Sequence, residues 1–162
     1  MQMPIQAFAE QNCSIAKPLS FLGERWALLV LRDITLGRRR FDEIQESLGV
    51  ASNVLSQRLA TLVEEEVLER RPYSEHPERF EYRLTEKGLD LEPVLLALLR
   101  WGDRWTAGPE GPPLETVHDD CGHSFHLVPT CSECGEELKP RHIHSRPGPG
   151  ANEKQLRQWR GR

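Results

Sequence analysis

The sequence lacks the features that mark membrane, secreted and enzymatic proteins. Trp26–Leu31, with six residues, is among its longest apolar runs, whereas a membrane-spanning helix needs about 20 residues. The N-terminal stretch MQMPIQAFAEQNC has no basic start followed by an apolar block, so a secretory signal is not expected. No paired carboxylates, nucleotide-binding loop or nucleophile elbow stands out. These absences predict a cytoplasmic protein that is neither membrane-bound nor an enzyme.

Cysteine is scarce as well, with four residues among 162. Cys13 stands alone near the N-terminus, while Cys121, Cys131 and Cys134 cluster near the C-terminus. Without a secretion signal a reducing environment is expected, and there a disulfide framework is less favoured than metal binding or a reactive thiol. The cysteines therefore predict either a metal site or a redox-active thiol.

Positive charge is not in excess overall, because the formal net charge is −4. This balance gives no support for a nucleic-acid ligand, but the local distribution of charge sets the field that a phosphate meets. Arginines lie within and on both sides of the segment 41–62, and they are Arg38, Arg39, Arg40, Arg58, Arg70, Arg71, Arg79 and Arg83. Acidic residues are concentrated elsewhere, for example at 64–66. A run of arginines is commonly just a solvated patch, so its weight depends on the segment it brackets.

Residues 38–62, RRRFDEIQESLGVASNVLSQRLATL, contain two short helical patterns separated by a turn. Gly49 is expected to end the first helix, and Ser52 to cap the second. The apolar residues of each pattern share one side at helical spacing: Phe41, Ile44 and Leu48, then Leu55, Leu59 and Leu62. Two short helices joined this tightly form a helix-turn-helix, whose second helix fits the major groove of DNA.

The polar face of the second helix carries donors and acceptors that can read base edges. Arg58 is expected on the flank of this face, where a phosphate would lie, and Ser52 at its start. The residues of the face itself are Asn53, Ser56, Gln57 and Thr61. The alternative is the solvent face of an ordinary amphipathic helix, so the neighbouring segments have to decide.

The segment before the helix-turn-helix predicts a support for it. From Cys13 the pattern is helical, and Pro18 and Gly23 divide it into two pieces. The second piece, from about 24 to 36, is apolar nearly all round, which is typical of a helix buried on most sides.

The segment after the helix-turn-helix predicts a β-hairpin. Residues 67–73 and 80–84 are strand-like runs that flank a polar segment containing Pro77. A hairpin in this place is a wing, and Arg79 near its tip is expected to enter a neighbouring minor groove, where arginine is favoured. The alternative is a solvent-exposed hairpin without a partner.

Residues 85–106 are predicted to form one helix with more apolar surface than its own domain can cover. Six of the seven residues from Val94 to Arg100 are apolar, and Trp101 and Trp105 follow. A second copy of the same helix would cover the excess, so a two-fold homodimer is expected.

Several of these motifs occur in the order found in the HxlR family of bacterial winged-helix transcriptional regulators, relatives of the MarR family, which this chain resembles from about Cys13 to Trp105. They are a cysteine that opens the first helix, GERW, GRRRF, LSQRL, the aromatic-Glu-Tyr of the wing and LTEKG. The resemblance implies a cytoplasmic, nucleoid-associated homodimer that binds double-stranded DNA, with repression as the expected outcome. It places base recognition on Asn53, Ser56, Gln57 and Arg58, and the wing contact on Arg79. Glu66 departs from the family, because many relatives have glycine there.

The C-terminal region predicts a zinc site. It follows a linker, GPEGPP, and contains HDDCG at 118–122 and CSECG at 131–135. Each has the pattern ligand-x-x-Cys-Gly, in which the glycine lets backbone amides turn toward the sulfur. The predicted structural zinc has a Cys3His ligand set: His118, Cys121, Cys131 and Cys134. His123 is the alternative fourth ligand, and a metal-free hairpin with three thiols is the alternative structure.

Cys13 has two interpretations. A cysteine before a helix is favoured as a thiolate, and some HxlR-like proteins use a cysteine at this place as a redox sensor, so an oxidant or a small molecule is expected as effector. The favoured interpretation is that Cys13 is a small buried hydrophobe.

The predicted fold is mainly α with a small β-hairpin wing, a winged helix-turn-helix, followed by a small metal-stapled C-terminal module. We expect the DNA-binding and dimerisation domain at 1–107, a linker at 108–116, the zinc-ribbon-like module at 117–146 and a basic, flexible tail at 147–162. The predicted function is a sequence-specific DNA-binding transcriptional regulator. A winged-helix protein–protein interaction module and a thiol oxidoreductase are the alternatives.

Overall fold

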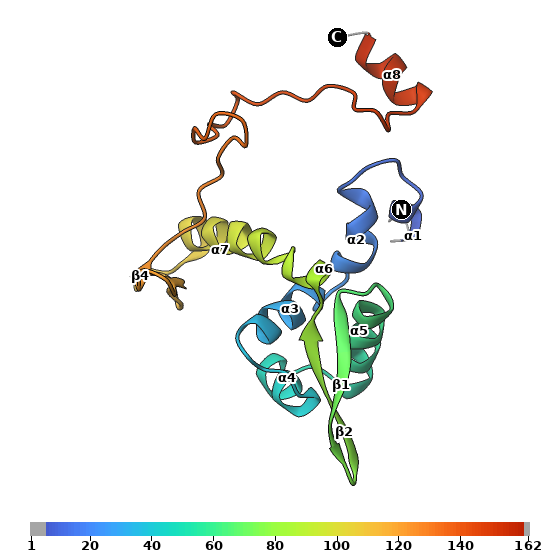
Figure 1. Cartoon of the computed structure of the whole chain (residues 1–162), viewed down its shortest axis with the longest axis vertical. Coiled ribbons are helices and arrows are strands. Elements are labelled where there is room, and N and C mark those ends of the chain that lie inside the picture. Colours follow the sequence, from blue (N-terminus) through green and yellow to red (C-terminus); the bar gives the residue numbers. More distant parts are fainter. Residues whose placement is uncertain (1–5, 161–162) are drawn as a thin grey trace. The chain divides into compact units, whose positions relative to one another are not determined.

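The structure is a computed structural model that describes residues 6–160 (Figure 1). The chain divides into two compact units, Met1–Pro113 and Leu114–Arg162, and the division falls inside the segment 108–116 predicted as a linker. Within residues 6–160, no helix is long and apolar enough to cross a membrane.

The core of the first unit is built around α3 (Ala27–Thr35). Ala27, Val30, Leu31 and Ile34 of this helix are buried, as expected for a helix that is apolar nearly all round. Two shorter helices precede it, α1 (Gln6–Ala9) and α2 (Ala16–Leu22). The prediction of a buried support helix is therefore confirmed.

The helix-turn-helix consists of α4 (Phe41–Leu48) and α5 (Ser52–Glu64). Gly49 ends α4 in the left-handed conformation with φ 60°, and its N–H donates to the Gln45 carbonyl at 2.9 Å. The predicted apolar side of α5 is buried, with Leu55 and Leu59 1% exposed and Leu62 fully covered. The capping prediction is wrong, because Ala51 is the N-cap residue and Ser52 is already helical.

The wing is an antiparallel hairpin of β1 (Leu68–Glu75) and β2 (Glu78–Leu84). Its register pairs Leu68 with Leu84 at the base and Glu75 with Glu78 at the tip. The strands are longer than predicted and the turn between them is correspondingly shorter. Figure 1 shows that the tip of the hairpin extends beyond α4 and α5.

Glu66 forms the turn between α5 and the wing in a left-handed conformation, with φ 57°. This is the conformation that glycine adopts without cost and that other L residues adopt at about 1–2 kcal/mol. Two hydrogen bonds hold the turn: the Val67 N–H donates to the Leu62 carbonyl at 2.9 Å, and the Thr85 hydroxyl donates to the Glu66 carbonyl at 2.6 Å. Contacts with the segment after the wing therefore support a backbone shape that the local sequence disfavours.

The prediction of a single helix at 85–106 is wrong. The structure has two helices in this segment, α6 (Glu86–Leu89) and α7 (Glu92–Thr106). Pro93 lies in the first turn of α7, a position where its fixed φ suits a helix start and its missing N–H is not needed. Four apolar side chains of α7 are more than half exposed, and they recur at helical spacing: Val94, Leu98, Trp101 and Trp105.

The second unit has little regular structure. It contains two short paired strands, β3 (Val117–His118) and β4 (His123–Ser124), and the helix α8 (Glu153–Arg160). The segment predicted as a flexible tail thus includes a helix. None of the residues from 114 to 159 is buried, so this unit has no apolar core of its own among them.

Candidate nucleic-acid interface

The exposed side of α5 carries the polar residues that the sequence singled out. Asn53, Ser56 and Gln57 are exposed, and Thr61 is half-buried, with its hydroxyl donating to the Gln57 carbonyl at 3.1 Å. The opposite side of the helix is fixed by the buried Leu55, Leu59 and Leu62. This arrangement presents amide and hydroxyl groups on a rigid helix, and such groups bind the edges of bases.

Ser52 is held by the preceding helix. The side-chain amide of Gln45 in α4 donates to the Ser52 hydroxyl at 2.7 Å and to the Val50 carbonyl at 3.3 Å. Gln45 therefore ties α4 to the start of α5 and fixes the angle of the turn. Nothing in the sequence pattern singles out Gln45, because its partner Ser52 is seven residues away across a turn.

Arg58 is buried, and its expected place on the exposed flank of α5 is wrong. Its side chain is 9% exposed, and Nη2 lies 3.0 Å from Oε2 of Glu24, in the loop between α2 and α3. Among the described residues its Nε has no hydrogen-bond partner. Arg58 therefore anchors α5 to the loop that precedes α3, and its guanidinium is turned away from the exposed side of α5. The partner is 34 residues away, so helical periodicity alone could not identify it.

The three consecutive arginines differ in their surroundings. Arg39 and Arg40 are exposed, and their backbone N–H groups both donate to the Glu43 carboxylate at 3.0 Å. Arg38 is partly covered, and its guanidinium lies 3.7 Å from the carboxylate of Asp33, which is fully buried. Arg39 and Arg40 are thus more available to phosphates than Arg38, whose charge is partly compensated.

Two arginines lie over aromatic rings of the wing. The guanidinium of Arg40 lies 4.5 Å from the centre of the Tyr73 ring, and that of Arg70 lies 3.4 Å from the centre of the Phe80 ring. Such stacking orients a guanidinium while leaving its positive charge in place. Arg79 is exposed one residue into β2, beside the tip where the sequence placed it.

Cys13 is exposed, so the favoured prediction of a buried residue is wrong. It lies just before α2, and the backbone N–H groups of Ala16 and Ile15 point at its sulfur and lower the pKa of the thiol. An accessible thiol with a lowered pKa has the properties of a reactive cysteine. The structure therefore fits the redox-sensor hypothesis better than the hypothesis of a small buried hydrophobe.

The predicted zinc ligands form two pairs in the second unit. His118 Nδ1 lies 3.4 Å from Cys121 Sγ. The backbone N–H groups of Cys134 and Glu133, together with the Cys134 side chain, bond the Cys131 sulfur and lower the pKa of Cys131. The described residues do not bring three or more candidate ligands together at one point.

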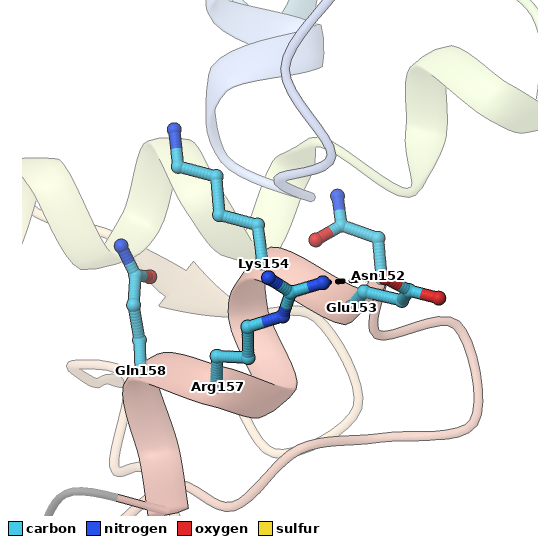
Figure 2. Close-up of a pocket in the computed structure, with 5 residues that line it drawn as sticks. All are labelled: Asn152, Glu153, Lys154, Arg157 and Gln158. Carbon is cyan, nitrogen blue, oxygen red and sulfur yellow. Dashed lines mark hydrogen bonds and ion pairs between the residues drawn. The ribbon is translucent and has the colours of Figure 1, made fainter.

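Polar side chains of α8 and of the residue just before it lie around a surface hollow (Figure 2). They are Asn152, Glu153, Lys154, Arg157 and Gln158. Arg157 pairs with Glu153 at 2.8 Å, and all five lie on one exposed segment. Side chains from consecutive turns of a single helix do not enclose a ligand, so we assign no binding site to this hollow.

Comparison with known proteins identifies the first unit. The sequence model of the HxlR-like helix-turn-helix family matches residues 21–109, which is more than half of the chain. The chain belongs to the HxlR-like family.

The similarity of this HxlR-like protein to known proteins extends over both units. It is 44% identical over 137 residues to the uncharacterized HTH-type transcriptional regulator Rv3095 of Mycobacterium tuberculosis, covering 85% of this chain and 87% of the relative. The crystal structure of PA1607, a candidate transcription factor, matches with a TM-score of 0.78 at 34% identity and covers 88% and 99% of the two chains. The reduced form of the Bacillus subtilis regulator YodB matches over 59% of this chain and 96% of its own, with a TM-score of 0.51 at 33% identity. A match of 137 residues is longer than the first unit, so it extends into the second.

We predict that Arg58→Ala lowers the free energy of unfolding by about 2 kcal/mol. Breaking a buried ion pair commonly costs about 3–5 kcal/mol, and the partial exposure of Glu24 reduces this cost. Denaturant unfolding of the variant measures the change. Glu24→Ala is the matched control, and because the two residues form a pair, the losses should not add in the double variant.

The same Arg58→Ala variant separates the anchoring role from a phosphate contact. A residue that binds a phosphate contributes about 1 to the slope of log affinity for DNA against log salt. We expect this slope to be unchanged in Arg58→Ala at temperatures where the variant is folded. A slope that falls by about 1 would contradict the structural assignment.

We predict that Cys13 reacts with iodoacetamide at lower pH than an ordinary cysteine does. The lowered pKa means that the thiolate, which is the reactive form, is already present at a pH where an ordinary thiol is protonated. The modification rate should therefore rise with pH and level off above the lowered pKa. Peptide mass spectrometry measures this rate against free N-acetylcysteine, and a midpoint at or above that of the free thiol would refute the prediction. Unchanged DNA affinity after modification would remove the sensor role.

Proposed function

We propose that this HxlR-like protein is a homodimeric, sequence-specific DNA-binding transcriptional regulator. In each subunit α5 would enter the major groove, and the wing β1–β2 would reach an adjacent minor groove. The observation that carries the proposal is the exposed polar side of α5. The opposite side of α5 carries buried leucines that pack against the support helix α3. Membership of a helix-turn-helix family supports the same conclusion.

The proposed binding mechanism divides affinity from specificity. Arg39, Arg40 and the wing Arg79 are exposed cations that would contact phosphates or the minor groove, and such contacts hold a protein on DNA without reading sequence. Asn53, Ser56 and Gln57 would contact base edges. The burial of Arg58 removes one of the predicted phosphate contacts from this interface.

Repression is the outcome that we propose for DNA binding. Occupancy of a promoter is by itself enough to exclude other proteins from the same DNA, whereas activation also requires a surface that recruits the transcription machinery. An oxidant that modifies Cys13 is the effector included in this proposal, because the thiol is exposed and its pKa is lowered. Transcription of a reporter with the selected operator, with and without the protein, tests the direction of control.

The proposed dimer rests on the exposed apolar stripe of α7. Val94, Leu98, Trp101 and Trp105 are 51–64% exposed and share one side of the helix. A continuous exposed apolar patch of this kind marks a protein contact more often than a free surface. A second α7 related by two-fold symmetry presents the same stripe, and a dimer matches the two half-sites of a helix-turn-helix operator.

We predict that Gln57→Ala weakens binding to the cognate site by about 1–3 kcal/mol and leaves binding to random duplex DNA nearly unchanged. A side-chain amide that contacts a base contributes to discrimination and little to non-specific binding. Selection from a random DNA pool supplies the cognate site, and titration of both DNAs at one salt concentration measures the difference.

Arg39→Ala is the matched control for Gln57→Ala. Loss of a phosphate contact should weaken binding to both DNAs alike and reduce the salt slope by about 1. Equal losses on both DNAs for Gln57→Ala would contradict its recognition role. No salt-dependent binding of the unmodified protein to any duplex would overturn the proposed function as a whole and would favour a protein–protein interaction module.

We predict that Leu98→Glu converts the dimer into a monomer. The substitution places a charge in the centre of the apolar stripe, where pairing with a second α7 would bury it without a partner. Sedimentation at micromolar concentration measures the change in mass. Leu36→Glu is the matched control, because Leu36 is 48% exposed at the end of α3 and Leu98 is 51% exposed in α7. A monomeric unmodified protein would refute the dimer.

A further inference from the structure

We propose that the second unit binds one structural zinc ion through His118, Cys121, Cys131 and Cys134. The proposal concerns a part of the chain outside the helix-turn-helix, and it does not depend on DNA binding. It rests on two separate turns of the same shape, each of which holds a pair of zinc-type ligands. No residue of the DNA-binding interface takes part.

The first turn already holds its two ligand atoms at metal-ligand spacing. His118 Nδ1 and Cys121 Sγ lie 3.4 Å apart. In a tetrahedral zinc site, Zn–N distances of 2.0–2.1 Å and a Zn–S distance of 2.3 Å place the two ligand atoms about 3.6 Å apart. The backbone fixes this spacing, because the N–H groups of Cys121 and Gly122 donate to the His118 carbonyl at 3.3 and 2.7 Å.

The second turn repeats this arrangement with two cysteines. The Gly135 N–H donates to the Cys131 carbonyl at 2.8 Å, as the Gly122 N–H does to the His118 carbonyl in the first turn. Both glycines have positive φ, 69° at Gly122 and 73° at Gly135. The side chains of Cys131 and Cys134 contact each other. The sequence pattern ligand-x-x-Cys-Gly therefore produces one local shape twice, with both ligands of each turn on the same side.

The surroundings of His118 favour it over His123 as the fourth ligand. His118 Nε2 lies 3.6 Å from the Asp120 carboxylate, while Nδ1 faces the Cys121 sulfur. A metal-bound histidine commonly directs its second ring nitrogen to a carboxylate, which fixes the tautomer that leaves the first nitrogen free for the metal. The His118 ring also lies edge-on to Phe125, with ring centres 6.0 Å apart. His123 is the cross-strand partner of His118, and no comparable pair of contacts orients it among those described for this unit.

The second unit needs an additional source of stability, and a metal would supply it. No residue from 114 to 159 is buried, and its paired strands have two residues each. A segment of this size without a core is commonly stabilised by a disulfide or a metal. Residues 123–130 join the two turns, and closing so short a loop costs little entropy. Zinc would therefore draw the two ligand pairs together and fold the unit around itself.

The donor set defines the role of the metal. Three cysteine sulfurs and one imidazole suit zinc, and with all four positions filled by the protein no coordination site remains for water. The ion would therefore be structural. Binding would deprotonate the three thiols, so affinity should fall as the pH is lowered.

Metal analysis of the purified full-length protein tests the proposal. We expect about one zinc per chain when the protein is prepared without chelators, and we expect Cys134→Ser and His118→Ala to lose most of it. Cys13→Ser and His123→Ala are the matched controls and should keep it. Circular dichroism of each variant shows whether the first unit remains folded, so that loss of zinc is not confused with loss of the whole structure.

Cobalt provides a second readout for the same ligands. Co²⁺ added to the metal-free protein should give the thiolate charge-transfer and visible ligand-field bands of a tetrahedral site, and zinc should displace it. Absence of zinc from the purified protein, together with no such spectrum on adding Co²⁺, would overturn the site. Loss of zinc in His123→Ala but not in His118→Ala would overturn the assignment of the fourth ligand.

Discussion

The packing of α5 against α3 is the contact on which the rest of the first unit depends. Leu55, Leu59 and Leu62 of α5 join Leu31 and Ile34 of α3 in one buried cluster. Each fully buried leucine contributes about 1.5–3 kcal/mol relative to an exposed one, so this contact is large compared with the 5–15 kcal/mol by which domains are stable. It also determines which side of α5 is left exposed, and so which side chains are presented to a partner.

The ion pair between Arg58 and Glu24 adds direction to that apolar contact. Leucines can slide against one another with modest loss, but a buried guanidinium must meet its carboxylate, because leaving it unpaired in the core is costly. The pair therefore fixes the rotation of α5 about its own axis. A basic residue of α5 thus serves the protein's architecture, while exposed arginines lie just before α4 and on the wing.

Local patterns in the sequence predict which helices and strands form more accurately than they predict the contacts between them. The spacing of Leu55, Leu59 and Leu62 gives the buried side of α5, and Gly49 gives the end of α4. The ends of elements are predicted less accurately than their type. Pro93 favours a helix start, and in the structure it lies in the first turn of α7, where the sequence predicted one continuous helix. The partner of Arg58 lies in a segment that is distant in sequence, and helical periodicity cannot identify it. The exposure of Cys13 depends on how the chain before α2 is placed, and periodicity does not predict this either.

Glu66, in its left-handed conformation, lies where α5 ends and the wing begins. Its strained backbone lies at the junction of α5 and the wing, and it is held by the Thr85 hydroxyl. Thr85 also accepts a hydrogen bond from the Gly88 N–H and so caps α6, the short helix that leads into α7. The turn between α5 and the wing is therefore held partly by the residue that begins the segment after the wing. Loss of the Thr85 hydroxyl would remove both hydrogen bonds at once, so a single side chain connects the conformation of the turn after α5 to the start of α6.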